Sequence, residues 1–546
     1  MSDRSSRTVD IDAWVAAGRA DEAEALLRDV LQARPLDVGA LVHAARLAAR
    51  RRDFARAQGL AAKALSQAPG HPGAALALAD ALLNLGHARE AAIHFRKAEA
   101  LRPDIALCRH GLGRALAKLG RVAEARAMLS RLFDRHPDLA PLWGESAAVA
   151  LAHAGDLAGA VELMRRDLSR PRLKYQHDAC VHALGLLERA KNLPTDGGIL
   201  GSLVVWGEPY LDAWLGLTLP SLLHPSNLPA LAKDRRLRLR VFSDQAGRAR
   251  LEASPAMARL ARFATIDIEV MPEFMLDPAG RAATGQRYLA FALMHHVALH
   301  EATARRADVL TLFPDMVAAE GSYRYVGEVI ADGRYDALVA QAVTGRAADM
   351  TAALRPKIRN HELGIASGPL LDLVFAVLHP RSRAALMRDG TGLAPADPGI
   401  LTFADPKGVR MRMLQPLPLW ISHRILAPSV RYKFSTPDDE LLERLFPAPR
   451  DWARILVPEN ADRFCYVGAE TARPEDWPEP PAVRDVAQAV ADAARRQGLG
   501  GAFRRWMLSH ETLFRGAVAP PWADAPDPAG LIARVVAAAD RAMSET

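Results

Sequence analysis

The chain has 546 residues, half of them apolar and 24% charged, a globular composition too long for one ordinary core. Its formal charge of +7 comes from 61 Arg and nine Lys interspersed with acidic residues, so no nucleic-acid footprint stands out. Three scattered cysteines, Cys108, Cys180 and Cys465, give neither a disulfide framework nor a metal-ligand spacing. We find no apolar run near the roughly 18 residues of a membrane span, and a polar start, and therefore expect a cytoplasmic protein.

Prolines recur every 34 residues in the first third of the chain, at Pro35, Pro69, Pro103, Pro137 and Pro171. Twelve residues before each proline stands a residue small enough for two helices to approach closely: Ala23, Ala57, Ala91, Ala125 and Gly159. Glycines mark the turns inside the repeats, and larger apolar residues are expected on buried faces of second helices: Gly18, Gly86, Gly120 and Gly155, then Phe95, Leu129 and Leu163. The pattern predicts stacked helical pairs.

In period and residue type, residues 8–171 resemble the tetratricopeptide repeat (TPR) family. The resemblance implies an all-α TPR solenoid of five helical pairs with a concave groove. A helix over residues 177–193 is expected to cap it, so the array and its cap cover residues 1–193. Such repeats usually hold a protein or peptide, which we expect in the groove. The alternative is that the array only packs on the second domain or self-associates.

Residues 194–200 break the helical pattern and predict a linker. Short apolar runs then alternate with helix-length segments: strands near 203–206, 237–242, 266–271, 310–313 and 337–340, and helices near 210–223, 248–263, 286–306 and 323–332. Repeated β-α units predict an α/β domain over residues 201–446, with a mostly parallel sheet. Residues 447–546 are expected to form a mixed, mainly helical extension, with helices near 482–496, 502–513 and 529–543.

Asp315 is the first candidate site residue, because it follows a doubly buried strand at residues 310–313. Open α/β sheets bind ligands outside the carboxyl ends of their strands. Glu208 follows the first strand in the same way, and Ser243 and Asp244 end the second. Each of these could instead only turn the chain or cap a helix. No glycine-rich phosphate loop, H-E-x-x-H or G-x-S-x-G motif is present, which disfavours dinucleotide enzymes, P-loop enzymes and the hydrolases of those classes.

Val241-Phe-Ser-Asp244, Phe313-Pro-Asp315 and the layout of residues 204–229 resemble sugar-nucleotide glycosyltransferases of the GT-A type. The resemblance implies a GT-A-like domain, a nucleotide-sugar donor contacted by Ser243, Asp244 and Glu208, and Mg²⁺ or Mn²⁺ bound at Asp315. The family carries Asp-x-Asp here, whereas Met316 and Val317 follow Asp315. One carboxylate with the phosphates could hold the metal, Arg or Lys could replace it, or the domain could be inactive.

Glu362, in a polar loop, is the candidate general base for an acceptor hydroxyl. The sequence therefore predicts a glycosyltransferase whose TPR array recruits a protein acceptor or partner. The rival hypothesis is a non-catalytic TPR scaffold that carries a degenerate glycosyltransferase-like domain. A third, a nucleic-acid-associated scaffold, would show binding that weakens steeply with salt.

Overall fold

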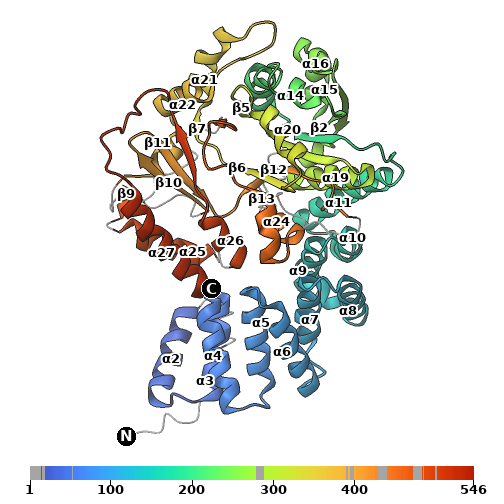
Figure 1. Ribbon diagram of the computed structural model, residues 1–546. Helices are drawn as coiled ribbons and strands as arrows, with labels where there is room; N and C mark the ends of the chain where they lie inside the picture. Colours follow the sequence, from blue (N-terminus) through green and yellow to red (C-terminus); the bar gives the residue numbers. More distant parts are fainter. Residues whose placement is uncertain are drawn as a thin grey trace. The chain divides into compact units, whose positions relative to one another are not determined.

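The computed structural model describes residues 11, 14, 19–51, 53–277, 288–388, 392–393, 399–427, 439–470, 482–483, 485–497 and 501–545. The chain divides into two compact units, Met1–His177 and Asp178–Thr546. The units are described one at a time, with the elements labelled as in Figure 1.

The first unit is a row of helices. Its described helices are α2 (Ala20–Ala33), α3 (Val38–Arg50), α4 (Phe54–Gln67), α5 (Pro72–Asn84), α6 (Ala88–Leu101), α7 (Ala106–Lys118), α8 (Val122–Arg135), α9 (Ala140–His153) and α10 (Leu157–Met164). Short 3₁₀ turns, Pro137–Leu139 and Arg165–Asp167, precede α9 and follow α10. Helix α11 (Pro171–Ala190) runs from the end of this unit into the next.

The 34-residue helical repeat is confirmed, and its small residues show why it exists. Ala23, Ala57, Ala91 and Ala125 are each 0% exposed, so no larger side chain fits where they lie. The predicted buried residues of the second helices, Phe95, Leu129 and Leu163, are all buried. This region is therefore TPR-like. Gly18 and the first helix of the first pair fall on residues outside those described.

Glycine ends the first helix of a pair three times. Gly86, Gly120 and Gly155 have φ of 92°, 73° and 84°, the left-handed conformation that stops a helix and that glycine adopts without strain. The capping helix expected from residue 177 instead starts at Pro171, because proline is well suited to the first turn of a helix.

The second unit is built on a seven-stranded sheet in the order β13-β6-β12-β4-β1-β2-β3. Its strands are β1 (Ile199–Val204), β2 (Leu237–Ser243), β3 (Ala264–Val270), β4 (Asp308–Leu312), β6 (Ala337–Ala340), β12 (Leu417–Ile421) and β13 (Ile455–Leu456). Strands β3, β2, β1 and β4 run parallel, β12 is antiparallel to both neighbours, and β13 is parallel to β6. The second unit is thus α/β with a mostly parallel sheet.

Smaller sheets join segments that are distant in the chain. The three-stranded sheet is β5 (Met316–Ala318), β14 (Tyr466–Glu470) and β7 (Thr344–Arg346), with β14 in the middle. A four-stranded sheet contains β8 (Leu386–Met387), β10 (Ile400–Asp405), β11 (Gly408–Met413) and β16 (Thr512–Arg515), and a two-stranded one pairs β9 (Gly392–Leu393) with β15 (Ala482–Val483).

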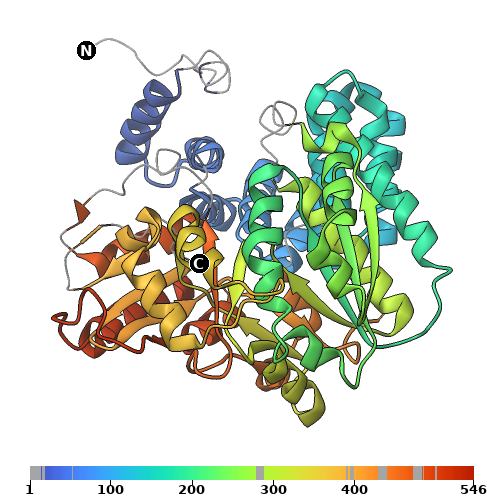
Figure 2. The ribbon, with the colours of Figure 1, turned by 90° about the horizontal axis from the view of Figure 1, so that it is seen from above.

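Helices cover both faces of the main sheet (Figure 2). Those before β6 are α12 (Glu208–Ala213), a π-helical turn (Trp214–Thr218), α13 (Leu219–Leu222), α14 (Leu228–Ala232), α15 (Gln245–Glu252), α16 (Pro255–Leu260), α17 (Glu273–Leu276), α19 (Leu289–Arg305) and α20 (Ser322–Asp332). Those after it are α21 (Ala347–Leu354), α22 (Ser367–Ala376), α23 (Pro380–Ala384), α24 (Asp439–Leu445), α25 (Val486–Gln497), α26 (Ala502–Leu508) and α27 (Ala529–Glu545), with 3₁₀ turns Arg355–Lys357 and Pro449–Arg454.

Three helices differ from expectation. The helix predicted over 248–263 is broken into α15 and α16, because Pro255 disfavours helical backbone in Ser254, which instead caps α16. The helix predicted over 210–223 contains the π-helical turn. The one predicted over 502–513 ends at Leu508, since Thr512 to Arg515 pair with β11.

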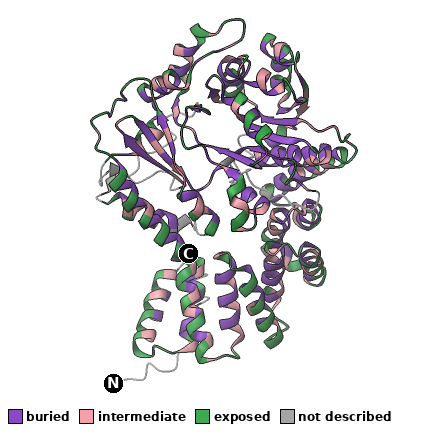
Figure 3. Ribbon diagram, viewed as in Figure 1, coloured by how far each residue is buried: buried purple, intermediate pink, exposed green. Residues whose placement is uncertain are grey.

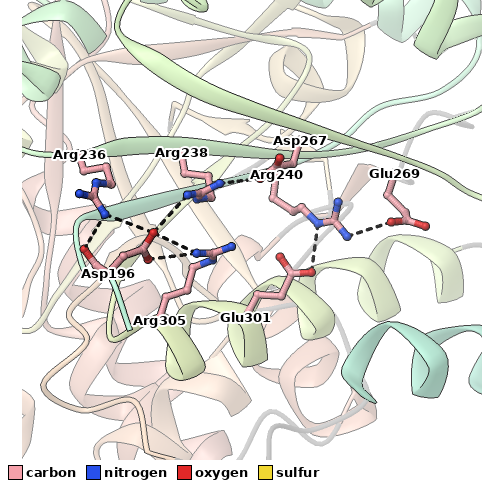
Figure 4. Close-up of polar contacts among 8 residues, drawn as sticks. All are labelled: Asp196, Arg236, Arg238, Arg240, Asp267, Glu269, Glu301 and Arg305. Atoms are coloured by element: carbon pink, nitrogen blue, oxygen red, sulfur yellow. Dashed lines mark hydrogen bonds and ion pairs between the residues drawn. The ribbon is translucent and has the colours of Figure 1, made fainter. Parts of the chain in front are cut away.

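The two faces of β2 are chemically different. Leu239 and Val241 point into the core that helices α15 and α16 cover, and the burial of the sheet interior is visible in Figure 3. Arg238 and Arg240 lie on the other face and form ion pairs with carboxylates of β3, α19 and the segment before β1 (Figure 4). Within the described part of the chain, every helix is too short or too polar to cross a membrane.

Candidate functional site

The candidate site lies at the carboxyl ends of β1 and β4, the middle strands of the sheet. Leu203 of β1 pairs with Leu312 of β4, so the chain leaves both strands at the same edge. From β1 the sheet continues to β2 on one side and to β4 on the other, which makes this the topological switch point where open α/β sheets bind ligands.

Asp315 lies in the turn that joins β4 to β5 at this switch point. The Thr218 hydroxyl, from the π-helical turn, donates a hydrogen bond to the Pro314 carbonyl at 2.7 Å. The backbone N–H of Ala469 donates to the Asp315 carbonyl at 2.7 Å. The turn is therefore held from both sides, and single π-helical turns of this kind are frequent near functional sites.

A second carboxylate reaches Asp315 from the end of β14. This strand is antiparallel to β5, with Gly468 opposite Met316, and it ends at Glu470. Burial, and secondly the negative charge of Glu470, raise the pKa of the Asp315 carboxyl to about 6. Sequence reasoning missed Glu470, because only the pairing of β5 with β14 brings it to Asp315.

Buried polar side chains fix strand β5 behind Asp315. The Ser221 hydroxyl donates to the Thr218 carbonyl and accepts from the Ala318 N–H at 3.0 Å. The Asn227 amide donates to the Ser221 and Ala319 carbonyls, and its oxygen accepts from the Tyr323 N–H at 3.1 Å. None of these side chains was identified from the sequence, where an isolated Ser or Asn gives no signal.

The other predicted donor residues lie on neighbouring strand ends. Glu208 is exposed in the first turn of α12, directly after β1. Asp244 caps α15 through the Gly247 N–H and accepts from the Gly207 N–H at 3.2 Å, so both carboxylate oxygens already hold the fold. Ser243 is fully buried beneath the start of α15, and its hydroxyl has no hydrogen-bond partner among the described residues.

Glu362 belongs to a different cluster. It closes a two-residue hairpin with Arg359, whose central residues Asn360 and His361 have φ of 49° and 66°. Its carboxylate forms an ion pair with Arg259 of α16. Within the part of the chain that the structure describes, the contacts of Glu362 do not join it to Asp315.

The residues at the switch point are compatible with one divalent cation shared with a phosphate ligand. Carboxylate oxygens suit Mg²⁺ and Mn²⁺, and Mg²⁺ is commonly held by one or two carboxylates together with substrate phosphates. Across the described ranges no group of three or more His, Cys, Asp or Glu side chains is placed to hold a metal by itself. The arrangement is thus a pair, Asp315 and Glu470, rather than a complete protein cage.

Comparison with known proteins supplies no family. No protein-family model and no curated protein match the chain. Among solved structures it is similar to a thermophilic TPR protein of Thermus thermophilus (20% identity, 31% of this chain and 95% of the other, TM-score 0.27). It is also similar to YrrB, described as a TPR protein with an unusual peptide-binding site (18% identity, 32% and 88% coverage, TM-score 0.26).

A longer stretch, 57% of the chain, is similar to 52% of a mutant of the Thermobaculum terrenum O-GlcNAc transferase, with 16% identity and a TM-score of 0.20. Scores this low carry no argument about function. The TPR-like and α/β architectures stand on the helices, strands and pairings of the chain itself.

Proposed function

We propose that the second unit is a GT-A-like glycosyltransferase domain that binds a nucleotide-sugar donor at the switch point between β1 and β4, and that the TPR-like array recruits a protein acceptor or partner. The observation that supports this most is the pair of carboxylates, Asp315 and Glu470, at the place where the sheet topology predicts a ligand.

The pair answers the main objection raised by the sequence. A GT-A-like site is expected to have a second acidic residue two positions after the first, and this chain has Val317, which is fully buried. Glu470 supplies a carboxylate near the same place from another strand. In this proposal Asp315 and Glu470 would hold Mg²⁺ or Mn²⁺ together with the donor diphosphate, and the cation would neutralise the charge that develops on the leaving phosphate.

The raised pKa of Asp315 fits this role. Two carboxylates that oppose each other's charge are unfavourable alone and favourable around a cation, because the cation relieves both the repulsion and the burial of charge. A site of this kind stores a preference for a positively charged ligand.

The remaining residues take roles that follow from their places. Glu208 is free to accept hydrogen bonds from the nucleoside, since it is exposed at the carboxyl end of β1. We assign Asp244 to positioning: it fixes the turn at Gly207 next to Glu208. Ser243 could meet a nucleoside only after α15 moves, because it lies under that helix. Glu362 would act as the base only after it exchanges Arg259 for an acceptor hydroxyl.

The test is a thermal-shift panel on the full chain with UDP-, GDP-, CMP- and dTDP-sugars, each with and without Mn²⁺. A donor at about 100 times its Kd should stabilise the second unit by roughly 2.7 kcal/mol. We expect one nucleotide to raise Tm in the wild type and not in Asp315→Asn. Asp332→Asn, an exposed carboxylate paired with Arg334, serves as the matched control and should respond like the wild type.

If no donor raises Tm of the wild-type chain, the transferase proposal fails. A shift that survives Asp315→Asn would place the donor elsewhere. The first result would favour the non-catalytic scaffold, in which the α/β unit is a degenerate transferase kept for binding or assembly.

A further inference from the structure

The first unit contains a groove along the inner helices of three successive repeats. It has a volume of about 540 Å³ and is lined by α3, α5 and α7. The apolar part of its lining includes Val42, Leu76 and Leu107, and Leu107 is 38% exposed. All lining residues belong to the first unit.

Basic side chains recur along this groove at the repeat spacing. Arg46 of α3 and Arg114 of α7 occupy the same position two repeats apart, and Asp80 of α5 is the acidic residue between them. Arg50 also lines the groove, and Lys118 occupies its position on α7. Three arginines against one aspartate leave the lining with an excess of positive charge.

Two of these arginines are not neutralised by the fold. Arg114 is partly buried, forms no hydrogen bond or ion pair with the described residues, and burial lowers its pKa despite the charge of Asp80. Arg50 is exposed and likewise has no polar partner among the residues that the structure describes. A guanidinium taken partly out of water without a counter-ion is costly, so an incoming carboxylate gains more here than at the open surface.

We propose that this groove binds an extended acidic peptide segment of a partner protein, with its carboxylates on Arg50 and Arg114 and apolar side chains between them on Leu76 and Leu107. Packed helices lie about 10 Å apart, so a path across three of them is about 20 Å long. An extended chain rises about 3.3 Å per residue, and the groove therefore holds about six residues.

The lining favours a peptide over a single-stranded nucleic acid. Nucleic acid bound to a basic groove stacks its bases on exposed aromatic rings. The rings in this lining, Phe95 and His110, are 1% and 3% exposed, and His110 is further occupied by Trp143 and Ser146. Apolar side chains of a peptide, by contrast, fit the exposed leucines.

This inference rests on the partner-recruiting role proposed for the array and not on the donor site. The experiment therefore uses the full chain without any nucleotide sugar. Fluorescence anisotropy would measure binding of labelled octapeptides that alternate Leu with Glu, Gln or Lys. We expect the Glu peptide to bind at least tenfold more tightly than the Gln peptide at low salt, an advantage of about 1.4 kcal/mol, and the Lys peptide not to bind.

Arg114→Gln and Arg50→Gln should each weaken the Glu peptide about tenfold, which brings it near the Gln peptide. Arg131→Gln, an exposed arginine of α8 outside the groove lining, should leave Kd within about twofold. Because Arg50 is exposed, its variant tests the groove even if Arg114→Gln disturbs folding.

Equal binding of the Glu and Gln peptides would overturn the proposal, as would equal losses in Arg131→Gln and Arg50→Gln. Displacement of the Glu peptide by single-stranded RNA of similar length, at a comparable concentration, would do so too. A positive peptide result together with a negative donor panel would retain the groove and reject only the transferase.

Discussion

At the scale of single residues, Asp315 is held where its own charge is unfavourable. Burial and Glu470 both oppose ionisation, and the turn cannot relax because Thr218 and Ala469 hold its backbone. Its pKa in the folded protein, about 6, lies above its ordinary value of 3.8. The folded state therefore binds this proton more tightly than the unfolded state.

The sign of the pH effect follows. The contribution of Asp315 to stability is present below about pH 4 and is lost as pH rises to about 6. Asp315→Asn should thus match the wild type at low pH and exceed it at pH 7.5 by about 2 kcal/mol in the free energy of unfolding. Scanning calorimetry of both proteins across this range would measure the difference. A wild type that is the more stable protein at pH 7.5 would contradict the raised pKa.

Asn227 tests the polar shell behind the site. It is fully buried and joins Ser221, Ala319 and Tyr323 by three hydrogen bonds. Asn227→Ala leaves buried groups unpaired and should cost about 2–4 kcal/mol. Asn460→Ala, at an exposed asparagine that accepts one bond from the Asp462 N–H, should cost less than about 1 kcal/mol in the same urea titration. Equal losses would mean that Asn227 only fills space.

Residue-level prediction from the sequence succeeded for Asp315 as a strand-end carboxylate and stopped there. Glu470 could not be found, because a strand pairing between distant segments brings it to Asp315. Asp244 and Ser243 lie at a strand end as predicted, yet a strand end alone does not say that the carboxylate of Asp244 caps a helix or that Ser243 lies under it.

At the scale of elements, the repeat helices follow local rules and were predicted well. The same residue types recur in phase, so each alanine, glycine and apolar residue reports the same packing several times. The β-α units were located but their boundaries moved: β1 begins at Ile199 rather than near residue 203, because a strand buried on both faces has no polar alternation to mark its start.

Two glycines separate conformational strain from helix propensity. Gly120 has φ of 73° with open space around its Cα, and Gly59 lies inside α4 with similarly open space. Gly120→Ala should destabilise the array by about 1 kcal/mol, whereas Gly59→Ala should stabilise it by about 0.5–1 kcal/mol. Thermal unfolding followed by circular dichroism would show the opposite signs. Stabilisation by both substitutions would exclude the left-handed turn.

The charged face of β2 tests a second element-scale feature. Arg240 is 11% exposed as a side chain and bridges Glu269 and Glu301, each at 3.1 Å (Figure 4). Arg240→Leu leaves two carboxylates without their partner and should cost about 3 kcal/mol. Arg248→Leu removes an exposed pair with Glu252 and should cost less than about 0.5 kcal/mol. Similar small losses would show that water reaches Arg240 freely.

At the scale of the whole molecule, the chain combines a binding array with a domain that carries a ligand edge. Each unit has its own structural logic: small residues at repeat spacing in the first, and a parallel sheet with a switch point in the second. The proposed division of labour gives the groove to the partner and the strand ends to the donor. It also predicts that groove variants and donor-site variants act independently in binding assays.

The central claim is that Asp315 and Glu470 act as one site, and Mn²⁺ binding in the presence of the donor tests it most directly. Isothermal titration of Mn²⁺ into wild type, Asp315→Asn, Glu470→Gln and the double variant forms a double-mutant cycle. We predict that each single variant loses about as much affinity as the double variant, so that the two effects are far from additive. Additive losses, or Mn²⁺ binding that ignores both substitutions, would contradict a shared site.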